Sequence, residues 1–202
     1  MAVELKQLES ALSHDLNNLL QVIMGNLELL KRRRELVPEI VEAALAATRS
    51  AAAMADRLGA ISRLRRLEPR ALDVSRLLAE LLPLIERTVG DAIRVELKLA
   101  SNLPDGLADP QSLQLALVEL ATNARNAMPA GGRLSIVTQD AGNGLIRIAV
   151  GDTGCGMAPR SPEATGLGLQ IVEQIMALSG GRVEFESTDL GTTVKLYLPT
   201  GK

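Results

Sequence analysis

The first 68 residues carry apolar side chains at helical spacing and show no strand signal. One apolar stripe recurs at steps of three and four along residues 5–30, and a second, richer in alanine, runs along residues 40–61. Such spacing places apolar side chains on one face of a helix. The chain breaks at "RRELVPE", where Pro38 suits the first turn of a new helix. Residues 1–68 therefore predict a helical hairpin.

The apolar faces of these two helices are wider than one partner helix can cover. Pairing two hairpins into a four-helix bundle would bury the remainder. The sequence thus predicts a homodimer through residues 2–68. The residues of the two stripes are Leu5, Leu8, Leu12, Leu16, Leu19, Ile23, Leu27 and Leu30 in the first helix, and Ile40, Ala44, Ala47, Ala51, Met54, Leu58 and Ile61 in the second.

From residue 72 onward, helical and strand patterns alternate. Pro69 to Leu72 has the character of a linker, Asp73 can cap a helix through about Val89, and a further helix starts at Asp109 and Pro110. Strand patterns cover residues 93–99, 133–139, 144–150, 182–188 and 192–199. Helices against a mostly antiparallel sheet form an α+β layer, so residues 72–202 predict a two-layer α/β sandwich.

The composition limits the classes of function. One Phe, one Tyr and no Trp require an aliphatic core, and Cys155, as the single cysteine, excludes an intramolecular disulfide. A formal net charge of −2 gives no bulk positive field for nucleic acid. No apolar run approaches the roughly 20 residues that span a bilayer, and no signal peptide is evident. We expect a cytoplasmic protein without nucleic-acid binding or membrane insertion.

A glycine-rich segment, "GDTGCGMAPRSPEATGLGL", follows one of the predicted strands. Glycines let the backbone approach a ligand and leave amides free to face phosphate oxygens, and the helix that begins near Leu167 adds its positive end. Asp152, directly after the strand, can accept a hydrogen bond from an amino group such as that of adenine. Taken alone, the segment fits an ordinary pair of turns better.

Three polar side chains share one face of the helix that starts at Pro110. Glu119, Asn123 and Asn126 stand at i, i+4 and i+7, and oxygen ligands of this kind can hold a hydrated Mg²⁺. Taken singly, each of them fits a solvated polar stripe better.

His14 is the only histidine and stands in "LSHDLNNLL". At roughly 100° per residue it lies opposite the leucine stripe of its helix, so we expect it to face solvent. Asn18 shares this outer face one turn on, and Asp15 lies beside it. An exposed imidazole can attack phosphorus through a free ring nitrogen, while a neighbouring carboxylate takes or orients the proton on the other nitrogen.

Four motifs occur in one order: "SHDLNNLL", "NARNAMP", "DTGCGM" and "TGLGL". The first resembles the phosphoacceptor box of two-component sensor histidine kinases. The others resemble the ATP-binding domain of the same family, which has the histidine kinase-like ATPase (Bergerat) fold. The resemblance extends from about Leu5 to Pro199. It implies an ATP-dependent protein-histidine kinase that phosphorylates itself and passes the phosphoryl group to an aspartate of a response regulator receiver domain.

The resemblance also implies roles for the matching residues. His14 would be phosphorylated, Asp15 would be its acid–base partner, and Asn18 would orient water for dephosphorylation of a bound regulator. Asn123 would ligate Mg²⁺, with Glu119 lining the same site. Asp152 would bind the adenine amino group of ATP. The other residues implied to bind the nucleotide are Asn126, Gly154, Gly156, Gly166, Leu167, Gly168 and Thr192.

The sequence departs from the family pattern in three places. Asn126 occupies a position that is commonly acidic or basic. Only eight residues, 158–165, separate "DTGCGM" from "GLGL", where the family has a much longer lid over the triphosphate. This short lid predicts weak activity. Because 13 residues precede His14, we expect input from a separate sensor protein, or a longer protein from which this core is cut.

Two other functions stay open at this point. A histidine phosphotransfer protein would keep the dimeric bundle and use the kinase-like second domain for docking, with little or no ATP-dependent activity. The short lid favours this alternative, and the intact nucleotide motifs count against it. A scaffold whose helices only dimerise would have no need of an exposed His–Asp pair. ATP binding separates the kinase from both.

Overall fold

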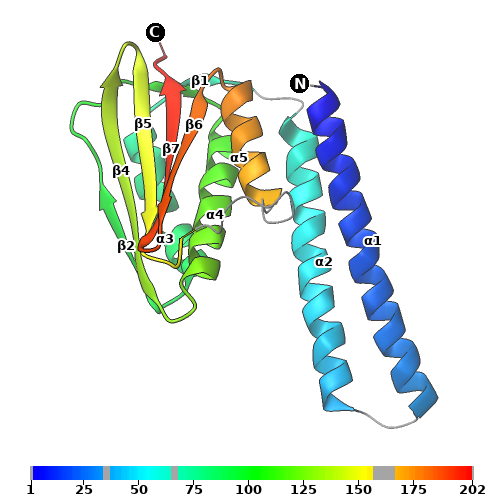
Figure 1. Cartoon of the computed structure of the whole chain (residues 1–202). Helices are drawn as coiled ribbons and strands as arrows, with labels where there is room; N and C mark the ends of the chain where they lie inside the picture. The colour runs from blue at the N-terminus through cyan, green and yellow to red at the C-terminus, as the bar shows by residue number, and fades with distance from the viewer. Residues whose placement is uncertain (1, 34–36, 65–67, 157–166, 202) are drawn as a thin grey trace. The chain divides into compact units, whose positions relative to one another are not determined.

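The computed structural model describes residues 2–33, 37–64, 68–156 and 167–201, and the chain divides into two compact units, residues 1–65 and 66–202. The first unit is an antiparallel pair of helices, α1 (Ala2–Arg33) and α2 (Pro38–Leu64), as Figure 1 shows. The second unit is a mixed sheet that carries helices on one face. The α+β fold class, a helical hairpin followed by an α/β sandwich, is confirmed.

The hairpin packs along the stripes that the sequence predicts. Leu12 of α1 is fully buried, and Ala44, Ala47 and Ala51 of α2 are nearly so. Small alanine side chains let the two helices approach closely, and Pro38 begins the second helix as expected. Among the described residues, no helix is both long and apolar enough to cross a membrane.

Two aspartates begin helices of the second unit, as predicted. Asp73 caps α3 (Val74–Val89) and Asp109 caps α4 (Pro110–Ala127). Each carboxylate accepts a hydrogen bond from the amide three residues on, at 2.9 and 2.8 Å respectively. Such a cap satisfies an amide that has no partner within the helix. A third helix, α5 (Leu167–Leu178), follows later in the chain.

The main sheet has the strand order β2-β4-β5-β7-β6. Its first pair, β2 and β4, is parallel and the other three pairs are antiparallel, in agreement with the predicted mostly antiparallel sheet. The strands are β2 (Ile93–Lys98), β4 (Gly132–Gly142), β5 (Leu145–Asp152), β6 (Arg182–Thr188) and β7 (Gly191–Pro199).

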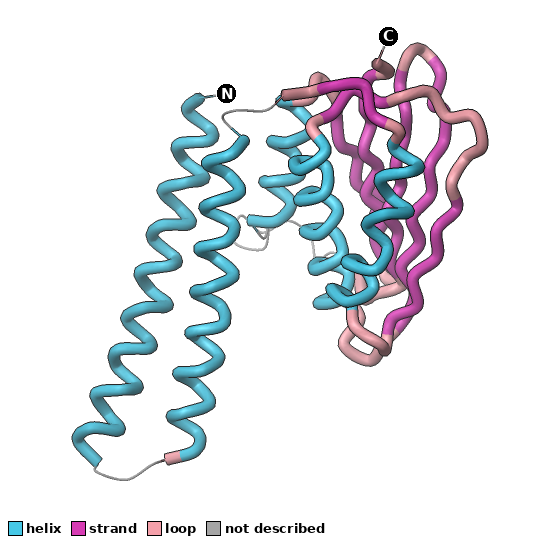
Figure 2. Tube along the Cα trace, turned by 180° about the vertical axis from the view of Figure 1, so that it is seen from behind, coloured by secondary structure: helices cyan, strands magenta, loops and turns pink. Residues whose placement is uncertain are grey.

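Helices α3, α4 and α5 cover one face of this sheet (Figure 2). The layer between them is aliphatic, as the composition requires. Burying each such side chain stabilises the fold by about 1.5–3 kcal/mol. The largest side chains with no more than 1% exposure outside the hairpin include Leu78, Ile85, Leu113, Leu134, Ile136, Ile146, Ile148, Ile171 and Ile175.

Residues 70–72 are not the linker that the sequence predicts. They form β1 (Arg70–Leu72), which pairs antiparallel with β3 (Gly106–Ala108) in a separate two-stranded sheet. A strand of three residues is too short to show a period of its own, and its partner lies far along the chain. Local pattern therefore could not reveal it.

The two ends of the second unit meet at this small sheet. The Gly201 amide donates a hydrogen bond to the Asp105 carbonyl at 2.8 Å, and a Cβ at Gly201 would lie 2.9 Å from the Cβ of Ala71. Thr200 forms a bridge with Gly106. The segment that enters the unit therefore lies beside the segment that leaves it.

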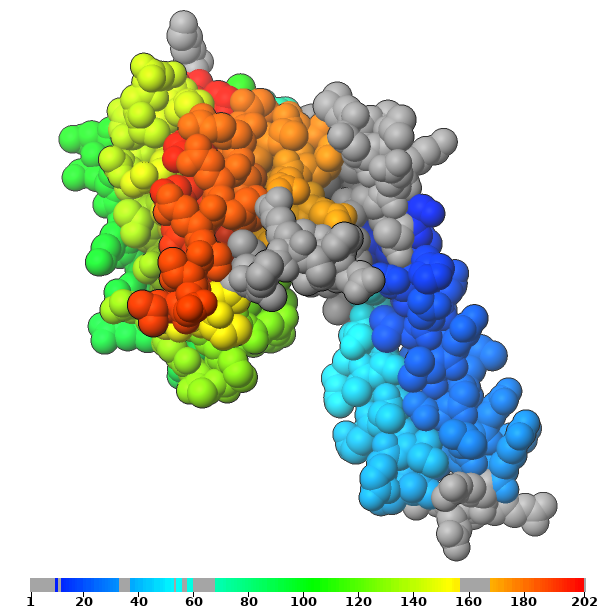
Figure 3. Space-filling view, in the orientation of Figure 1, coloured from blue at the N-terminus to red at the C-terminus, as the bar shows by residue number. Residues whose placement is uncertain are grey.

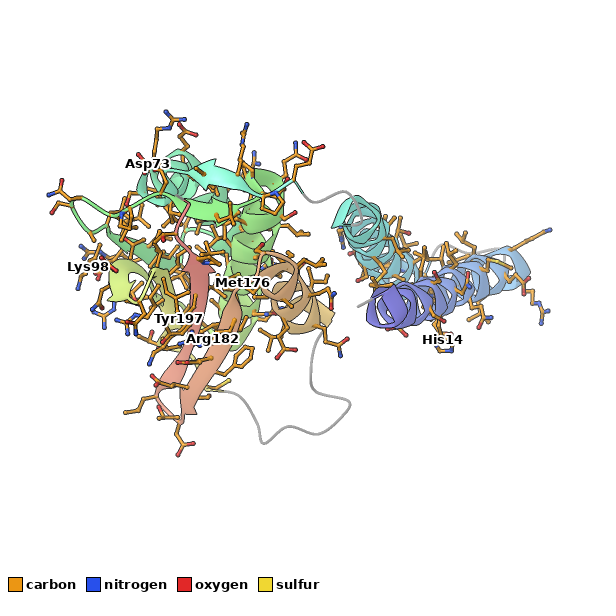
Figure 4. The ribbon with its side chains drawn as sticks, turned by 90° about the horizontal axis from the view of Figure 1, so that it is seen from above. His14, Asp73, Lys98, Met176, Arg182 and Tyr197 are labelled. Atoms are coloured by element: carbon orange, nitrogen blue, oxygen red, sulfur yellow. The ribbon has the colours of Figure 1, made fainter. Side chains whose placement is uncertain are left out.

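The opposite face of the main sheet is polar where β6 and β7 pair. Figure 4 shows Arg182 beside Tyr197, and the guanidinium carbon lies 3.9 Å from the ring centre. The Tyr197 hydroxyl donates to Glu184 at 2.9 Å, and Arg182 donates to the same carboxylate at 3.3 Å. The tyrosine first, and then the arginine, hold the pKa of Glu184 below its usual range.

Candidate functional site

His14 lies on the side of α1 that faces away from α2 (Figure 4). Its side chain is 75% exposed, which confirms the predicted solvent-facing position. The Nδ1 atom lies 3.3 Å from Oδ1 of Asp15 and 3.3 Å from Nδ2 of Asn18. In the described part of the chain, no hydrogen bond reaches Nε2. The structure thus brings the three predicted residues together and leaves Nε2 to an incoming group.

Asp152 ends β5, and two backbone amides hold its carboxylate. The Oδ1 atom accepts hydrogen bonds from the amide of Gly154 at 2.9 Å and from that of Thr192 at 3.2 Å. Gly154 belongs to the loop after β5 and Thr192 lies near the start of β7, so one oxygen fixes both segments. Among the described residues Oδ2 has no partner, which leaves it able to accept from a ligand amino group.

Gly191 is a site residue that sequence reasoning missed. Its φ is +139°, and a Cβ there would lie 2.0 Å from the Asp152 carbonyl oxygen. Only glycine allows β7 to come this close, and the approach places the amide of Thr192 on the carboxylate. The available signal was the glycine between the turn "TDL" and the pair "TT".

The loop of residues 153–156 packs against α4 and β6. The Cys155 amide donates to the Ala127 carbonyl at 3.2 Å. A Cβ at Gly156 would lie 2.1 Å from the Thr188 carbonyl oxygen, so this glycine permits the close packing. Both contacts are made through backbone atoms. These backbone contacts hold the loop at both sides, in addition to the hydrogen bond from the Gly154 amide to Asp152.

Helix α5 meets α4 at Gly168. A Cβ there would lie 2.6 Å from Oε2 of Glu119 and 3.5 Å from both amide atoms of Asn123. Glu119 is only 4% exposed, so it is not part of a solvated stripe, whereas Asn126 is exposed. The structure brings Glu119, Asn123 and Gly168 together, and Asn126 is not among the nearest neighbours of Gly168.

Two parts of the predicted site, the lid and the glycine-rich segment that follows it, lie at or beyond the limit of the described residues. Gly166 and the short lid lie in residues 157–166, outside the described residues. Leu167 is the first residue of α5. Their predicted contacts with phosphate stay predictions.

The side chains of Glu119 and Asn123 beside Gly168 fit the ligand preference of Mg²⁺. Glu119 and Asn123 offer carboxylate and amide oxygens, which Mg²⁺ prefers, and the glycine at 168 lets the start of α5 approach both side chains closely. The described residues contain no group of three or more His, Cys, Asp or Glu side chains able to hold a metal. A Mg²⁺ here would therefore complete its coordination with phosphate and water, as it usually does beside nucleotides.

The hairpin that carries His14 and the unit that carries Asp152 each match a known family of domain. Residues 4–67 match the His Kinase A (phospho-acceptor) domain, and residues 108–202 match the Histidine kinase-, DNA gyrase B-, and HSP90-like ATPase domain. The chain belongs to the histidine kinase family. His14 lies within the first match, and Asp152 and Thr192 lie within the second.

Known proteins resemble this histidine kinase over nearly its whole length. Sensor kinase CckA of Brucella abortus (strain 2308) is 31% identical over 226 residues, which cover 96% of this chain and 24% of CckA. The chain spans about a quarter to a half of the length of the curated relatives it matches.

Solved structures share the fold of this histidine kinase. Acinetobacter baumannii histidine kinase AdeS aligns with a TM-score of 0.75 at 18% identity, over 94% of this chain and 98% of that one. Histidine kinase ThkA in complex with response regulator protein TrrA aligns with a TM-score of 0.72 at 16% identity, over 95% and 60%. At these identities the likeness shows the fold alone.

Proposed function

We propose that this chain is the catalytic core of an ATP-dependent protein-histidine kinase. It phosphorylates Nε2 of His14 and passes the phosphoryl group to an aspartate of a response regulator receiver domain. The observation that carries the proposal is the arrangement at His14, with Nδ1 beside a carboxylate and Nε2 open on an exposed helix face. The match of residues 4–67 to a phosphoacceptor domain supports it.

His14 acts as the nucleophile in this proposal. Its Nε2 lone pair forms a bond to the γ-phosphorus of ATP, and the bond from that phosphorus to the bridging oxygen breaks, so ADP leaves with the electron pair. Asp15 accepts the proton from Nδ1. In the later dephosphorylation of a bound regulator, Asn18 orients the attacking water. Phosphoryl transfer depends mainly on positioning and charge neutralisation, so the second unit has to supply both.

The second unit binds the nucleotide. Oδ2 of Asp152 accepts a hydrogen bond from the adenine amino group, while the two amides that donate to Oδ1 fix the orientation of the carboxylate. Gly154, Gly156 and Thr192 line the adenine side, and residues 166–168 border the phosphates. Asn123, with Glu119 beside it, would hold Mg²⁺, which neutralises charge on the phosphates when it is bound.

The direct test of this function is incubation of the chain with labelled Mg-ATP. A phosphohistidine loses its label in acid and keeps it in base, so we expect acid-labile, base-stable label on the protein. Addition of a receiver domain should then move the label to that partner. Label that survives acid treatment would place the phosphoryl group on a hydroxyl group instead.

The homodimer and the partners belong to the same proposal. The hairpin leaves Leu20, Met24 and Leu27 of α1 at 45%, 61% and 54% exposure, and their spacing puts them on one face. Within the hairpin, α2 leaves the visible face of α1 (blue) uncovered in Figure 3. A second hairpin would cover these side chains. ThkA, which shares the fold, occurs with a response regulator, which supports a receiver domain as the partner. A separate sensor protein would supply the input.

Leu27→Glu is expected to convert a dimer into a monomer. Two copies of this side chain would be buried per dimer, each contributing about 1.5–3 kcal/mol, so the dissociation constant should rise about a hundred-fold or more. Light scattering after size exclusion measures the mass. Leu190→Glu, which changes an exposed leucine of the second unit, is the matched control and should leave the mass unchanged. A monomeric wild type would contradict the homodimer.

The short lid is expected to make autophosphorylation slow. Adenine and the inner phosphates can bind without a cover, so ATP and ADP should have similar, modest affinities. The terminal phosphate lacks the positioning that a long lid provides, and poor positioning can cost on the order of a hundred-fold in rate. Transfer from phosphorylated His14 to a regulator should be unaffected.

Calorimetric titration gives the two nucleotide affinities, and the two transfer rates are followed separately. A chimera in which a longer lid of the kind typical of the family replaces residues 158–165 is the control and should phosphorylate itself faster. A strong preference for ATP with rapid autophosphorylation would show that the short lid suffices. If no nucleotide binds, a histidine phosphotransfer protein becomes the better interpretation of this chain's function.

A further inference from the structure

Asp15 and Asn18 require different protonation states of Nδ1 of His14. Oδ1 of Asp15 and Nδ2 of Asn18 each lie 3.3 Å from Nδ1. An ionised carboxylate only accepts, so a hydrogen bond with Asp15 needs a proton on Nδ1. An amide NH₂ group only donates, so a hydrogen bond with Asn18 needs a lone pair there. In a neutral ring, Nδ1 cannot satisfy both partners at once.

The two hydrogen bonds favour different tautomers of the imidazole ring. With the proton on Nδ1, Nε2 carries a lone pair and can attack phosphorus. With the lone pair on Nδ1, the proton sits on Nε2, which then cannot attack. We propose that Asn18 is a positioning residue that holds a share of His14 in the non-nucleophilic tautomer and thereby restrains autophosphorylation. The hydrogen bond to Asp15 favours the nucleophilic tautomer.

The position of the three residues lets this competition act on the tautomer of the free protein. The side chains of His14 and Asp15 are 75% and 47% exposed, so the ring can exchange protons with water freely. Asn18 lies one helical turn from His14, and Asp15 is its neighbour in sequence, so both side chains reach Nδ1 without any ligand. The relative strength of the two hydrogen bonds therefore shifts the ratio of the two tautomers.

The size of the effect follows from one neutral hydrogen bond. Loss of a bond of ordinary strength changes a population ratio about five-fold. The autophosphorylation rate scales with the fraction of His14 in the competent tautomer. The transfer step stays as described: the bond from Nε2 to phosphorus forms, ADP leaves with the electron pair, and Asp15 receives the Nδ1 proton. Asn18 changes only the fraction of His14 that is in the nucleophilic tautomer.

The inference rests on the proposed kinase function, but the tautomer can be measured without any reaction. His14 is the only histidine, so ¹⁵N-histidine labelling of the full chain gives two ring signals whose shifts report which nitrogen carries the proton. In alkaline buffer, we expect Asn18→Ala to move the ratio about five-fold towards a proton on Nδ1. Asp15→Asn should move it the other way. Asn17→Ala, at the neighbouring exposed asparagine, is the matched control and should leave it unchanged.

The same variants are then incubated with Mg-ATP. We expect Asn18→Ala to phosphorylate itself several-fold faster than the wild type at unchanged ATP affinity. An unchanged tautomer ratio in Asn18→Ala overturns the inference, even if the wild type is an active kinase. So does a shift towards a proton on Nε2, because the amide would then present its oxygen to the ring. The expected shift without label in any variant leaves the tautomer control standing and overturns the proposed kinase function instead.

Discussion

His14→Gln is expected to abolish phosphoryl acceptance completely while ATP binding and the fold stay intact. Glutamine keeps a polar side chain of similar reach but has no nitrogen lone pair that can attack phosphorus. The histidine side chain is 75% exposed, so its replacement removes no core packing. The measurement is the amount of acid-labile label after incubation with labelled Mg-ATP, with circular dichroism and nucleotide titration as checks on the fold.

The matched control for this variant is Asn17→Gln, which makes a similar change on an exposed residue of the same turn. It should accept label as the wild type does. Because the chain contains no other histidine, no second histidine can take over the acceptor role. Acid-labile label that persists in His14→Gln would therefore contradict the assignment.

Asp152→Ala is expected to weaken nucleotide binding about ten- to a hundred-fold. The charged hydrogen bond to the adenine amino group contributes roughly 1.5–3 kcal/mol, and its loss gives this change in affinity. The variant also frees the amides of Gly154 and Thr192, so part of the loss would come from the loop and β7. Calorimetric titration with ATP and ADP measures the affinity.

Asp152→Asn separates these two causes. The asparagine oxygen can still accept from the amides of Gly154 and Thr192, whereas its NH₂ group, in the place of Oδ2, cannot accept from adenine. We therefore expect most of the affinity loss with the loop still held. Asn18→Ala, in the other unit, should leave ATP affinity unchanged. An unchanged affinity in both Asp152 variants would place the adenine site elsewhere.

Much of the fold could be predicted because its signals are local. The caps at Asp73 and Asp109, the break before Pro38 and the alternation in β6 all depend on residues within a few positions of each other. β1 could not be predicted, because three residues show no period and their partner strand is remote in sequence. The buried position of Glu119 likewise depends on α5, which follows α4 by some forty residues.

The two halves of the candidate site differ in the same way. His14 and Asn18 stand one helical turn apart and Asp15 is adjacent in sequence, so the local sequence was enough to place the three together and facing solvent. The contacts of Asp152 with Thr192, and of Gly168 with Glu119, join segments far apart in the chain. Only the resemblance to a family linked these residues beforehand, and Gly191, to which it gave no role, was missed.

The meeting of Gly201 with Ala71 has a consequence for how such a unit can be recombined. A unit whose entering and leaving segments share one corner can be inserted into another protein, or exchanged between relatives, without stretching the host chain. For the same reason a short bridge could join its ends, while new termini open at the exposed turn of Asn143 and Gly144 between β4 and β5. Gene fusion can therefore transfer the main sheet and its three helices as one unit, and the transferred segment has to include β1.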